Sequence, residues 1–104
     1  KVLNLLKPIL ENPNIGKIAH NFKYDLGVFL NHGIEVKGIL SDTMLESYVL
    51  SSASSQHSLD TLAEKQLHHR TIKYEDVTGK GSKQISFAEV DIFTATRYAA
   101  EDAD

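Results

Sequence analysis

The sequence predicts an α/β fold that is rich in helices and keeps about two parallel strands. Apolar residues recur at helical spacing in several stretches, and two short β-prone runs stand at residues 17–19 and 38–40 with a helical stretch between them. A strand, a helix and a second strand in this order call for parallel pairing with a right-handed crossover. The chain has 104 residues, of which 41% are hydrophobic, and this is enough for one globular domain.

The first half of the chain begins with a predicted helix over residues 2–10, where apolar side chains repeat at spacings of three and four. Pro8 lies inside this stretch, so a kink or an early break is expected there. Residues 12–16 contain Pro, Asn and Gly and end the helix. The run 17–19 is short and apolar, which is consistent with a brief buried strand.

A second helix is predicted over residues 22–30, with Asn21 as its cap and Gly33 as its left-handed terminator. The strand-like runs 34–36 and 38–40 follow, and the second run is the better candidate for the core. The order so far is therefore helix, strand, helix, strand. Because two strands make a small sheet, we expect that its partners are missing from the chain.

The second half of the chain is predicted to be mostly helical, with helices over residues 44–49, 59–67, 74–77 and 90–104. Residues 41–43, Ser-Asp-Thr, offer three candidate caps, and Thr43 and Glu46 have the spacing of a capping box. Ser58 and Ser86 are further candidate caps. The apolar face of the helix after Thr43 is expected to pack in the core.

The composition excludes several classes of protein. The absence of cysteine excludes disulfides and thiolate metal sites. No apolar run approaches the roughly 20 residues that a membrane span needs, and no signal peptide opens the chain, so we expect a cytoplasmic protein without a membrane partner. The net charge is -3, whereas proteins that grip DNA by counterion release carry an excess of Lys and Arg. Any binding of nucleic acid must therefore be local, act through metal ions or draw on residues outside the chain.

The most unusual pattern lies in the last eight residues, Arg97–Asp104. Three carboxylates crowd four consecutive positions of a helical stretch, where like charges repel one another and oppose the dipole of a helix that ends there. Tyr98 and Asp102 are four residues apart and share one helical face. An oxygen-rich site of this kind suits Mg²⁺ or Mn²⁺, and an acidic, solvated helix face is the alternative.

Three other polar segments each allow two interpretations. Asp25 either complements the dipole of its helix or points into a cleft where a strand gives way to a helix, which is where ligands bind in open α/β sheets. Residues 68–70, two His and an Arg, form a solvated helix end or contact a nucleic-acid strand. The loop 79–83 is a flexible linker or contacts phosphate through Lys80 or Lys83.

Several of these segments, read together, resemble a known family. Asn21-Phe22-Lys23-Tyr24-Asp25 is similar to the second exonuclease motif of the proofreading domains of bacterial DNA polymerase I. Residues 97–104 resemble the third motif in its tyrosine-containing variety, and residues 41–48 and 79–81 resemble the family at similar separations. The resemblance covers essentially the whole chain. It implies the Asp-Glu-Asp-Asp exonuclease superfamily and a ribonuclease-H-like fold.

This resemblance implies hydrolytic removal of the 3′-terminal nucleotide, with two divalent cations, Mg²⁺ or Mn²⁺, as cofactors. Asp102 would bind the ion that activates water, and Asp25 would hold the second ion. Tyr98 would orient the attacking water.

The resemblance also implies partners. Asn21, Tyr24 and Tyr74 match family positions near the bound strand, and the rings of Tyr24 and Tyr74 could stack on bases. The expected partners are the 3′ end of single-stranded DNA and the polymerase domain of the same parent chain.

The chain departs from the family in one respect, because the first motif, an Asp-x-Glu on a strand, does not occur in it. We therefore expect residues 1–104 to be the C-terminal portion of an exonuclease domain, a single incomplete domain truncated at the N-terminus. Such a fragment should hold its cations weakly or not at all and be inactive by itself. Its exposed sheet edge could pair with a second copy to form a homodimer.

Three alternatives remain at this point. The first is an exonuclease-fold scaffold of a polymerase that is catalytically dead, against which the retention of Asp25, Tyr98 and Asp102 argues. The second is an RNA 3′ exonuclease that resembles RNase D, although residues 41–48 and the loop at 79–81 favour the DNA polymerase. The third is a binding or scaffold module with an acidic helix.

Overall fold

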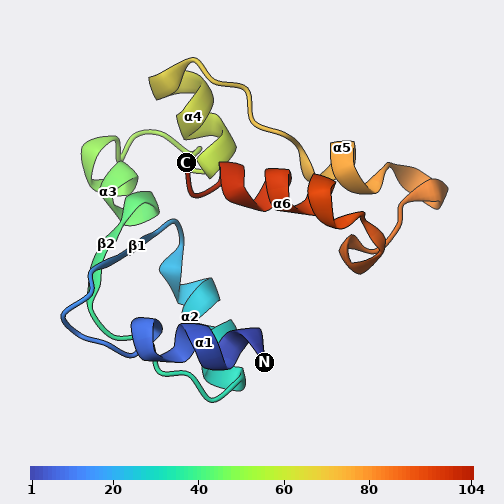
Figure 1. The fold of residues 1–104 in the computed structure, drawn as a ribbon. Helices are drawn as coiled ribbons and strands as arrows, with labels where there is room; N and C mark the ends of the chain where they lie inside the picture. The colour runs from blue at the N-terminus through green and yellow to red at the C-terminus, as the bar shows by residue number, and fades with distance from the viewer. The chain divides into compact units, whose positions relative to one another are not determined.

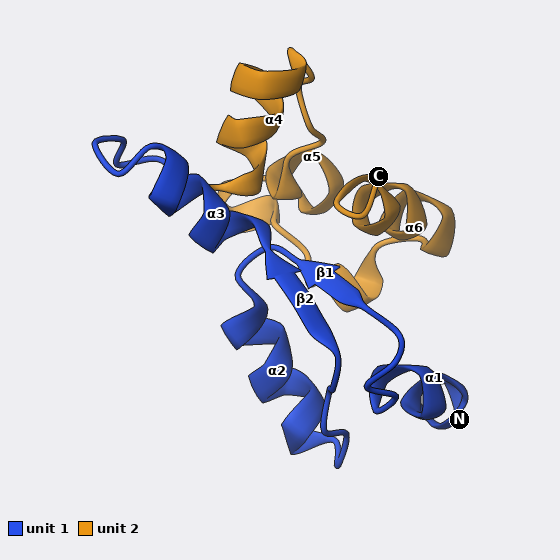
Figure 2. Cartoon of the chain, turned by 90° about the vertical axis from the view of Figure 1, so that its left-hand side faces the viewer, with its two compact units in different colours: residues 1–57 blue, residues 58–104 orange.

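The two predicted strands pair in the first of the two units into which the chain divides, residues 1–57 and residues 58–104 (Figure 2). The computed structural model describes all residues from Lys1 to Asp104. Unit 1 contains both strands and three helices, whereas unit 2 contains three helices and two short 3₁₀ turns. No helix in either unit has the length and the apolar character needed to cross a lipid bilayer.

Unit 1 alternates helices and strands in the predicted order (Figure 1). Its elements are α1 (Val2–Leu10), β1 (Lys17–Ala19), α2 (Phe22–Asn31), β2 (Ile39–Asp42) and α3 (Thr43–Leu50). Pro8 lies inside α1 without ending it. Gly33 has a φ of 73° and follows α2 as the predicted left-handed residue.

The sheet of unit 1 is parallel, as predicted. Its register pairs Ile18 with Ser41 and Ala19 with Asp42, and an irregularity follows Lys17. Both strands end at the same edge of the sheet, and α2 and α3 begin directly beyond it. The first turns of these two helices are therefore neighbours at the carboxyl edge of the strands.

The entry to β2 depends on a glycine. Gly38 has a φ of 74°, and a Cβ added to it would lie 2.6 Å from the carbonyl oxygen of Ile15 and 2.9 Å from that of Pro13. The Gly38 carbonyl also accepts a hydrogen bond from the amide of Lys17 at 2.9 Å. Only a residue without a side chain allows the backbone to approach the 12–15 turn this closely.

The prediction of a strand over residues 34–36 is wrong. The amide of Ile34 donates to the carbonyl of Phe29 at 3.0 Å, and the amide of Glu35 donates to Oε1 of Glu11 at 3.2 Å. The amides of Ile34 and Glu35 thus bond to a helix end and to a side chain, and neither bonds to a neighbouring strand. Ile34 is nevertheless 2% exposed and forms the core of unit 1 with Phe22, which is 6% exposed.

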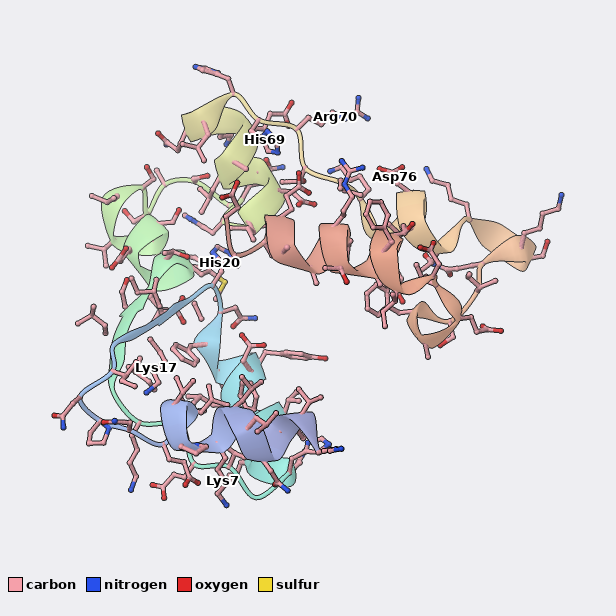
Figure 3. All side chains as sticks on the ribbon, viewed as in Figure 1. Lys7, Lys17, His20, His69, Arg70 and Asp76 are labelled. Carbon is pink, nitrogen blue, oxygen red and sulfur yellow. The ribbon has the colours of Figure 1, made fainter.

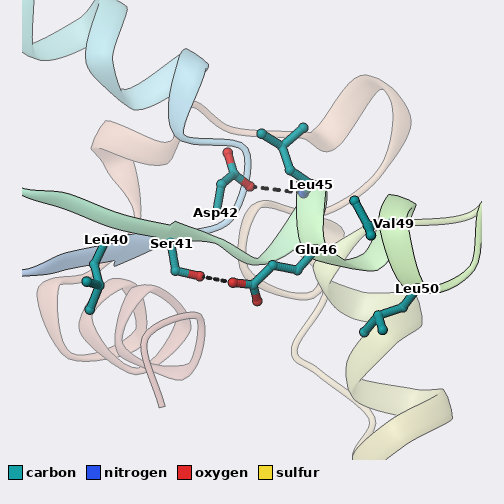
Figure 4. A pocket seen from close by; sticks show the side chains of 7 residues that line it. All are labelled: Leu40, Ser41, Asp42, Leu45, Glu46, Val49 and Leu50. Carbon is teal, nitrogen blue, oxygen red and sulfur yellow. Dashed lines mark hydrogen bonds between the residues drawn. The ribbon is translucent and has the colours of Figure 1, made fainter.

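The prediction that the apolar face of α3 packs in the core is also wrong. Val49 is 83% exposed, and the neighbouring apolar side chains line an open groove of about 490 Å³ (Figure 4). The groove is lined by Leu40, Ser41, Asp42, Leu45, Glu46, Val49 and Leu50. A sheet of two strands offers no second layer against which this face can pack.

The cap of α3 differs from the predicted capping box. The N-cap is Asp42, whose side chain accepts hydrogen bonds from the first turn, and Thr43 is already helical. Glu46 accepts a hydrogen bond from the hydroxyl of Ser41 and does not reach back to a cap residue. Of the three candidate caps at residues 41–43, Asp42 is therefore the one that caps α3, and the predicted capping box of Thr43 and Glu46 does not form.

Unit 2 consists of short helices joined by turns. Its elements are α4 (Leu59–Leu67), α5 (Tyr74–Thr78), the 3₁₀ turns Gly81–Lys83 and Phe87–Glu89, and α6 (Ile92–Glu101). Two predicted caps are confirmed, because Ser58 accepts a hydrogen bond from the amide of Thr61, and Ser86 forms a capping box with Glu89. The last helix begins after Asp91, which accepts from the amide of Thr94 at 2.9 Å.

Candidate active site

The residues of the second predicted motif lie at the start of α2. Asn21 is the N-cap of the helix, and Asp25 stands in its first turn with a half-buried side chain. Tyr24 is 71% exposed. Because α2 follows β1 directly, these side chains stand at the carboxyl edge of the parallel strands, which is where ligands bind in open α/β sheets.

The predicted capping by the side chain of Asn21 is wrong. Asn21 has a left-handed backbone with φ 60° and ψ 54°, and its side chain makes no cap hydrogen bond. The carboxylate of Asp42 accepts from the amide of Asn21 at 3.1 Å and from that of Phe22 at 2.8 Å. The start of α2 is therefore held by a side chain from another strand, and the exposed amide group of Asn21 is not engaged as a cap.

The same carboxylate serves α3. Asp42 accepts from the amide of Met44 at 3.0 Å. It also accepts from the amide of Leu45 at 3.4 Å, a bond that Figure 4 shows as a dashed line. Burial raises the pKa of Asp42, but the backbone N–H donors of both helices lower it by more, so its pKa lies below the ordinary 3.8. Asp42 is therefore ionised at neutral pH.

The residues of the third motif stand on the last turn of α6. Tyr98 and Asp102 are one turn apart, and Asp102 is the C-cap of the helix. The ring of Tyr98 meets those of Tyr74, at 6.2 Å, and Phe87, at 5.8 Å between centroids, and Tyr74 stacks on Phe87 at 6.2 Å. These three rings form an aromatic cluster that brings two predicted site residues, Tyr74 and Tyr98, together.

Sequence reasoning missed Phe87 as a member of this cluster. The capping box of Ser86 and Glu89 builds the 3₁₀ turn that presents the ring. The signal was present, since the spacing of a Ser and a Glu three residues later predicts a turn there. The contacts of the Phe87 ring could not be predicted from the neighbouring sequence, because its partners, Tyr74 and Tyr98, lie on α5 and α6.

The surroundings of Tyr98 raise the pKa of its phenol above the ordinary value of 10. Burial is the largest cause of its raised pKa, and the negative charges of Asp102 and Asp60 raise it further. A neutral phenol at physiological pH can donate and accept hydrogen bonds but carries no charge.

Glu101, the first of the three terminal carboxylates, is engaged within unit 2. It accepts from Nε2 of His69, which is labelled in Figure 3, at 2.8 Å and from the amide of Ile72 at 2.7 Å. The side chain of His69 and the Ile72 N–H lower the pKa of Glu101. His69 thus pairs with the helix that carries Tyr98, a role that neither interpretation of residues 68–70 included.

The loop after α5 is tied to that helix. Lys80 forms an ion pair with Glu75, and the hydrogen bond and charge of this partner raise the pKa of Lys80. Residues 81–83 form a 3₁₀ turn with Lys83 at its end. The loop therefore contains a short 3₁₀ turn, and its Lys80 is paired with a residue of α5.

Comparison with known proteins decides the family. A family model described as 3′-5′ exonuclease matches residues 1–104. The chain belongs to the 3′-5′ exonuclease family. Its relatives include DNA polymerase I of Pseudomonas aeruginosa, 50% identical over 99% of this chain and 12% of the relative, and DNA polymerase I of Rhizobium leguminosarum, 48% identical over 95% of this chain and 10% of the relative. DNA polymerase I of Chloroflexus aurantiacus is 40% identical over 99% of this chain and 11% of the relative.

These findings confirm the resemblance that the two motifs carried, and the helix-rich structure with two parallel strands agrees with a truncated ribonuclease-H-like exonuclease domain. The chain spans only about a tenth of the length of the curated relatives it matches.

The 3′-5′ exonuclease family generally uses divalent metals. The carboxylates of Asp25 and Asp102 are oxygen donors, which fit Mg²⁺ or Mn²⁺ in chemistry. They are too few to form a complete site, because no group of three or more His, Asp or Glu side chains is gathered to hold a metal ion. Asp25 belongs to unit 1 and Asp102 to unit 2, so their convergence stays a prediction.

Proposed function

We propose that this chain is part of a DNA polymerase I and contributes to a 3′-5′ exonuclease site that hydrolyses the 3′-terminal phosphodiester of single-stranded DNA. One observation carries the proposal. In a chain that matches the exonuclease family over its whole length, Tyr98 is held in an aromatic cluster one helical turn before Asp102.

Asp25 and Asp102 are the residues that would hold the divalent cations. When bound, such ions neutralise charge on the phosphate and lower the pKa of a water molecule. Asp25 is set at the start of a helix, and Asp102 at the end of one.

The proposed role of Tyr98 follows from its protonation. A phenol with its ordinary pKa of 10 is already neutral at physiological pH, and the raised pKa of Tyr98 moves it further from ionisation, so its hydroxyl orients the attacking water by a hydrogen bond and does not act as a charged base. Tyr74 and Phe87 limit the tilt of the ring from two directions. A hydroxyl on a restrained ring can fix the position of a water molecule without a large loss of entropy.

The strand would be held by exposed aromatic and amide groups. Tyr24 and Tyr74, the latter 46% exposed, offer ring faces on which bases can stack without regard to sequence, and Asn21 offers an exposed amide. The net charge of -3 favours local contacts with a strand end over a long electrostatic grip on a duplex.

The larger setting is also part of the proposal. The relatives named DNA polymerase I are about eight to ten times longer than the matched stretch, so we place residues 1–104 in the C-terminal portion of an exonuclease domain beside a polymerase domain in the cytoplasm. By itself the chain would bind Mg²⁺ or Mn²⁺ weakly and release nucleotides slowly or not at all.

The test compares two aspartates at the end of α6 in the full-length polymerase. Asp102→Ala should lower the release of 3′-terminal nucleotides from a labelled single-stranded DNA by on the order of a hundredfold or more, with polymerisation unchanged. Asp104→Ala, which removes a neighbouring carboxylate, should leave release within about twofold of the wild type.

The results that would contradict this proposal each point to a different conclusion. A wild type that releases no nucleotide would indicate a catalytically dead scaffold. Faster release from RNA than from DNA would indicate the RNA exonuclease. Equal loss in both variants would mean that Asp102 has no specific role.

A further inference from the structure

The carboxylate of Asp42 is the most heavily used acceptor in unit 1. It receives four backbone N–H groups, two from the start of α2 and two from the start of α3. Oδ2 accepts from Phe22 at 2.8 Å, and Oδ1 accepts from Asn21, Met44 and Leu45 at 3.1, 3.0 and 3.4 Å. An ordinary N-cap serves one helix, whereas this one serves two.

Further contacts hold the same edge of the sheet. Ala19 and Asp42 are register partners at the ends of the two strands. One residue on, Nδ1 of His20 lies 3.0 Å from Oγ1 of Thr43, which also donates to the carbonyl of Ala19 at 3.4 Å. The junction between β1 and α2 is therefore fastened to the junction between β2 and α3.

The start of α2 depends on this fastening. Asn21 is left-handed and makes no cap through its side chain, so the N–H groups of Asn21 and Phe22 have their acceptor on Asp42. Phe22 is buried, and an amide without a partner there would be costly. Asp25 stands in the same first turn, three residues after Phe22.

We infer that Asp42 is a positioning residue for the exonuclease reaction, because it fixes the first turn of α2 and with it the carboxylate of Asp25. The inference rests on the proposed function. Asp42 itself touches backbone amides and not the reacting atoms. Its effect on the reaction passes through the orientation of Asp25.

The chemistry of the acceptor explains why an aspartate is needed. A carboxylate offers two acceptor oxygens, and both are used here, since Oδ1 accepts from three of the N–H groups and Oδ2 accepts from the fourth. An asparagine of the same shape has one acceptor oxygen, and its NH₂ group would face a backbone donor at one of the two helix starts. Asp42→Asn should therefore keep the shape and weaken the bridge without removing it.

The experiment uses the full-length polymerase, with Asp42→Ala, Asp42→Asn and the control Ser58→Ala. Ser58 caps α4, which carries no residue of the proposed site, so its loss costs one ordinary cap. The readouts are the Mn²⁺ concentration that half-saturates nucleotide release, kcat, and KM for single-stranded DNA. Amide hydrogen exchange of residues 21–25 without metal is the readout that does not depend on activity.

Loss of a group that orients a metal ligand typically weakens metal binding or activity by about 10- to 100-fold. We expect Asp42→Ala to raise the half-saturating Mn²⁺ concentration by roughly tenfold or more and to lower kcat at limiting Mn²⁺, with KM for DNA within about twofold. Exchange at residues 21–25 should accelerate. Asp42→Asn should shift in the same direction by less, and Ser58→Ala should leave all four readouts unchanged.

The outcomes separate the inference from the proposed function. An active wild type whose Mn²⁺ dependence is unchanged in Asp42→Ala and Asp42→Asn would overturn the inference alone. The same holds if Ser58→Ala has an equal effect, which would reduce Asp42 to a structural cap. A wild type that releases no nucleotide would overturn the proposed function and the inference together. If Asp42→Ala loses polymerase activity and does not fold, the isosteric Asp42→Asn variant decides between these outcomes.

Discussion

Nε2 of His69 lies 2.8 Å from Oε1 of Glu101, so the residue beside Asp102 is joined to the segment that follows α4. Glu101 also accepts from the amide of Ile72 at 2.7 Å. These bonds hold the last turn of α6 to the segment at residues 69–72. They also engage one of the three terminal carboxylates, which reduces the repulsion that the sequence pattern indicated.

The bond between Glu101 and Ile72 should depend on pH. The pKa of Glu101 is lowered in the folded chain by the His69 hydrogen bond and the Ile72 N–H, so the bond is at full strength above the ordinary pKa of 4.5. It is lost as pH falls through the lowered value. Amide exchange should show that the protection factor of Ile72 is constant near neutral pH and falls below pH 4.5.

Glu101→Gln provides the control for that measurement. Its neutral side chain does not titrate, so the protection of Ile72 should be lower than in the wild type at neutral pH and should not fall further in acid. A wild type and a variant with the same acid profile would show that Glu101 does not hold the amide.

Removal of the Phe87 ring should slow the reaction without weakening DNA binding. Phe87→Ala frees one side of Tyr98, and we expect kcat for nucleotide release to fall on the order of tenfold while KM changes little. Phe93→Ala is the matched control, because Phe93 stands on α6 and is 70% exposed. Equal kcat values in the two variants would show that the aromatic cluster does not restrain Tyr98.

Tyr98→Phe should distinguish the contribution of the hydroxyl group from that of the ring. The ring contacts with Tyr74 and Phe87 remain, so stability should stay within about 0.5 kcal/mol, while kcat should fall by roughly tenfold or more. Because the pKa of Tyr98 is raised, the wild-type rate should show no step from this phenol below pH 10. The assignment of a neutral phenol would be contradicted if the rate of the wild type changed with pH near neutrality and this change were absent in Tyr98→Phe.

Two glycine substitutions should have opposite effects on stability. Gly38→Ala places a Cβ 2.6 Å from the carbonyl oxygen of Ile15 in a left-handed backbone, and should destabilise the chain by about 2–4 kcal/mol. Gly27→Ala lies inside α2 with no atom near its new Cβ, and should stabilise by about 0.5–1 kcal/mol. Urea unfolding measures both, and a tolerated Gly38→Ala would contradict the close approach of the 12–15 turn.

The sequence predicted those elements whose signals are local. The periodic apolar residues of α2, the β-prone run of β1 and the alanine-rich end of α6 gave elements close to the observed ones. Tyr98 and Asp102 share a helix, so their spacing alone placed them one turn apart.

The sequence did not predict features that depend on distant partners. Asn21 is a residue type that commonly caps helices, but its backbone is left-handed and its side chain makes no cap hydrogen bond. The first amides of α2 instead donate to Asp42, about twenty positions away. Phe87 is an aromatic residue in a loop until α5 and α6 bring Tyr74 and Tyr98 to it. Residues 34–36 have β propensity, but their amides bond to a helix end and a side chain.

The central claim is that Asp25 and Asp102 share divalent ions, and Mn²⁺ binding to the full-length polymerase tests it most directly. Free Mn²⁺ measured by electron paramagnetic resonance gives the affinity of the wild type, Asp25→Ala, Asp102→Ala and the double variant. If the two carboxylates share ions, each single variant loses most of the binding, and the double variant loses little more. Losses that add independently, or Mn²⁺ affinity equal to the wild type in Asp102→Ala, would contradict the account.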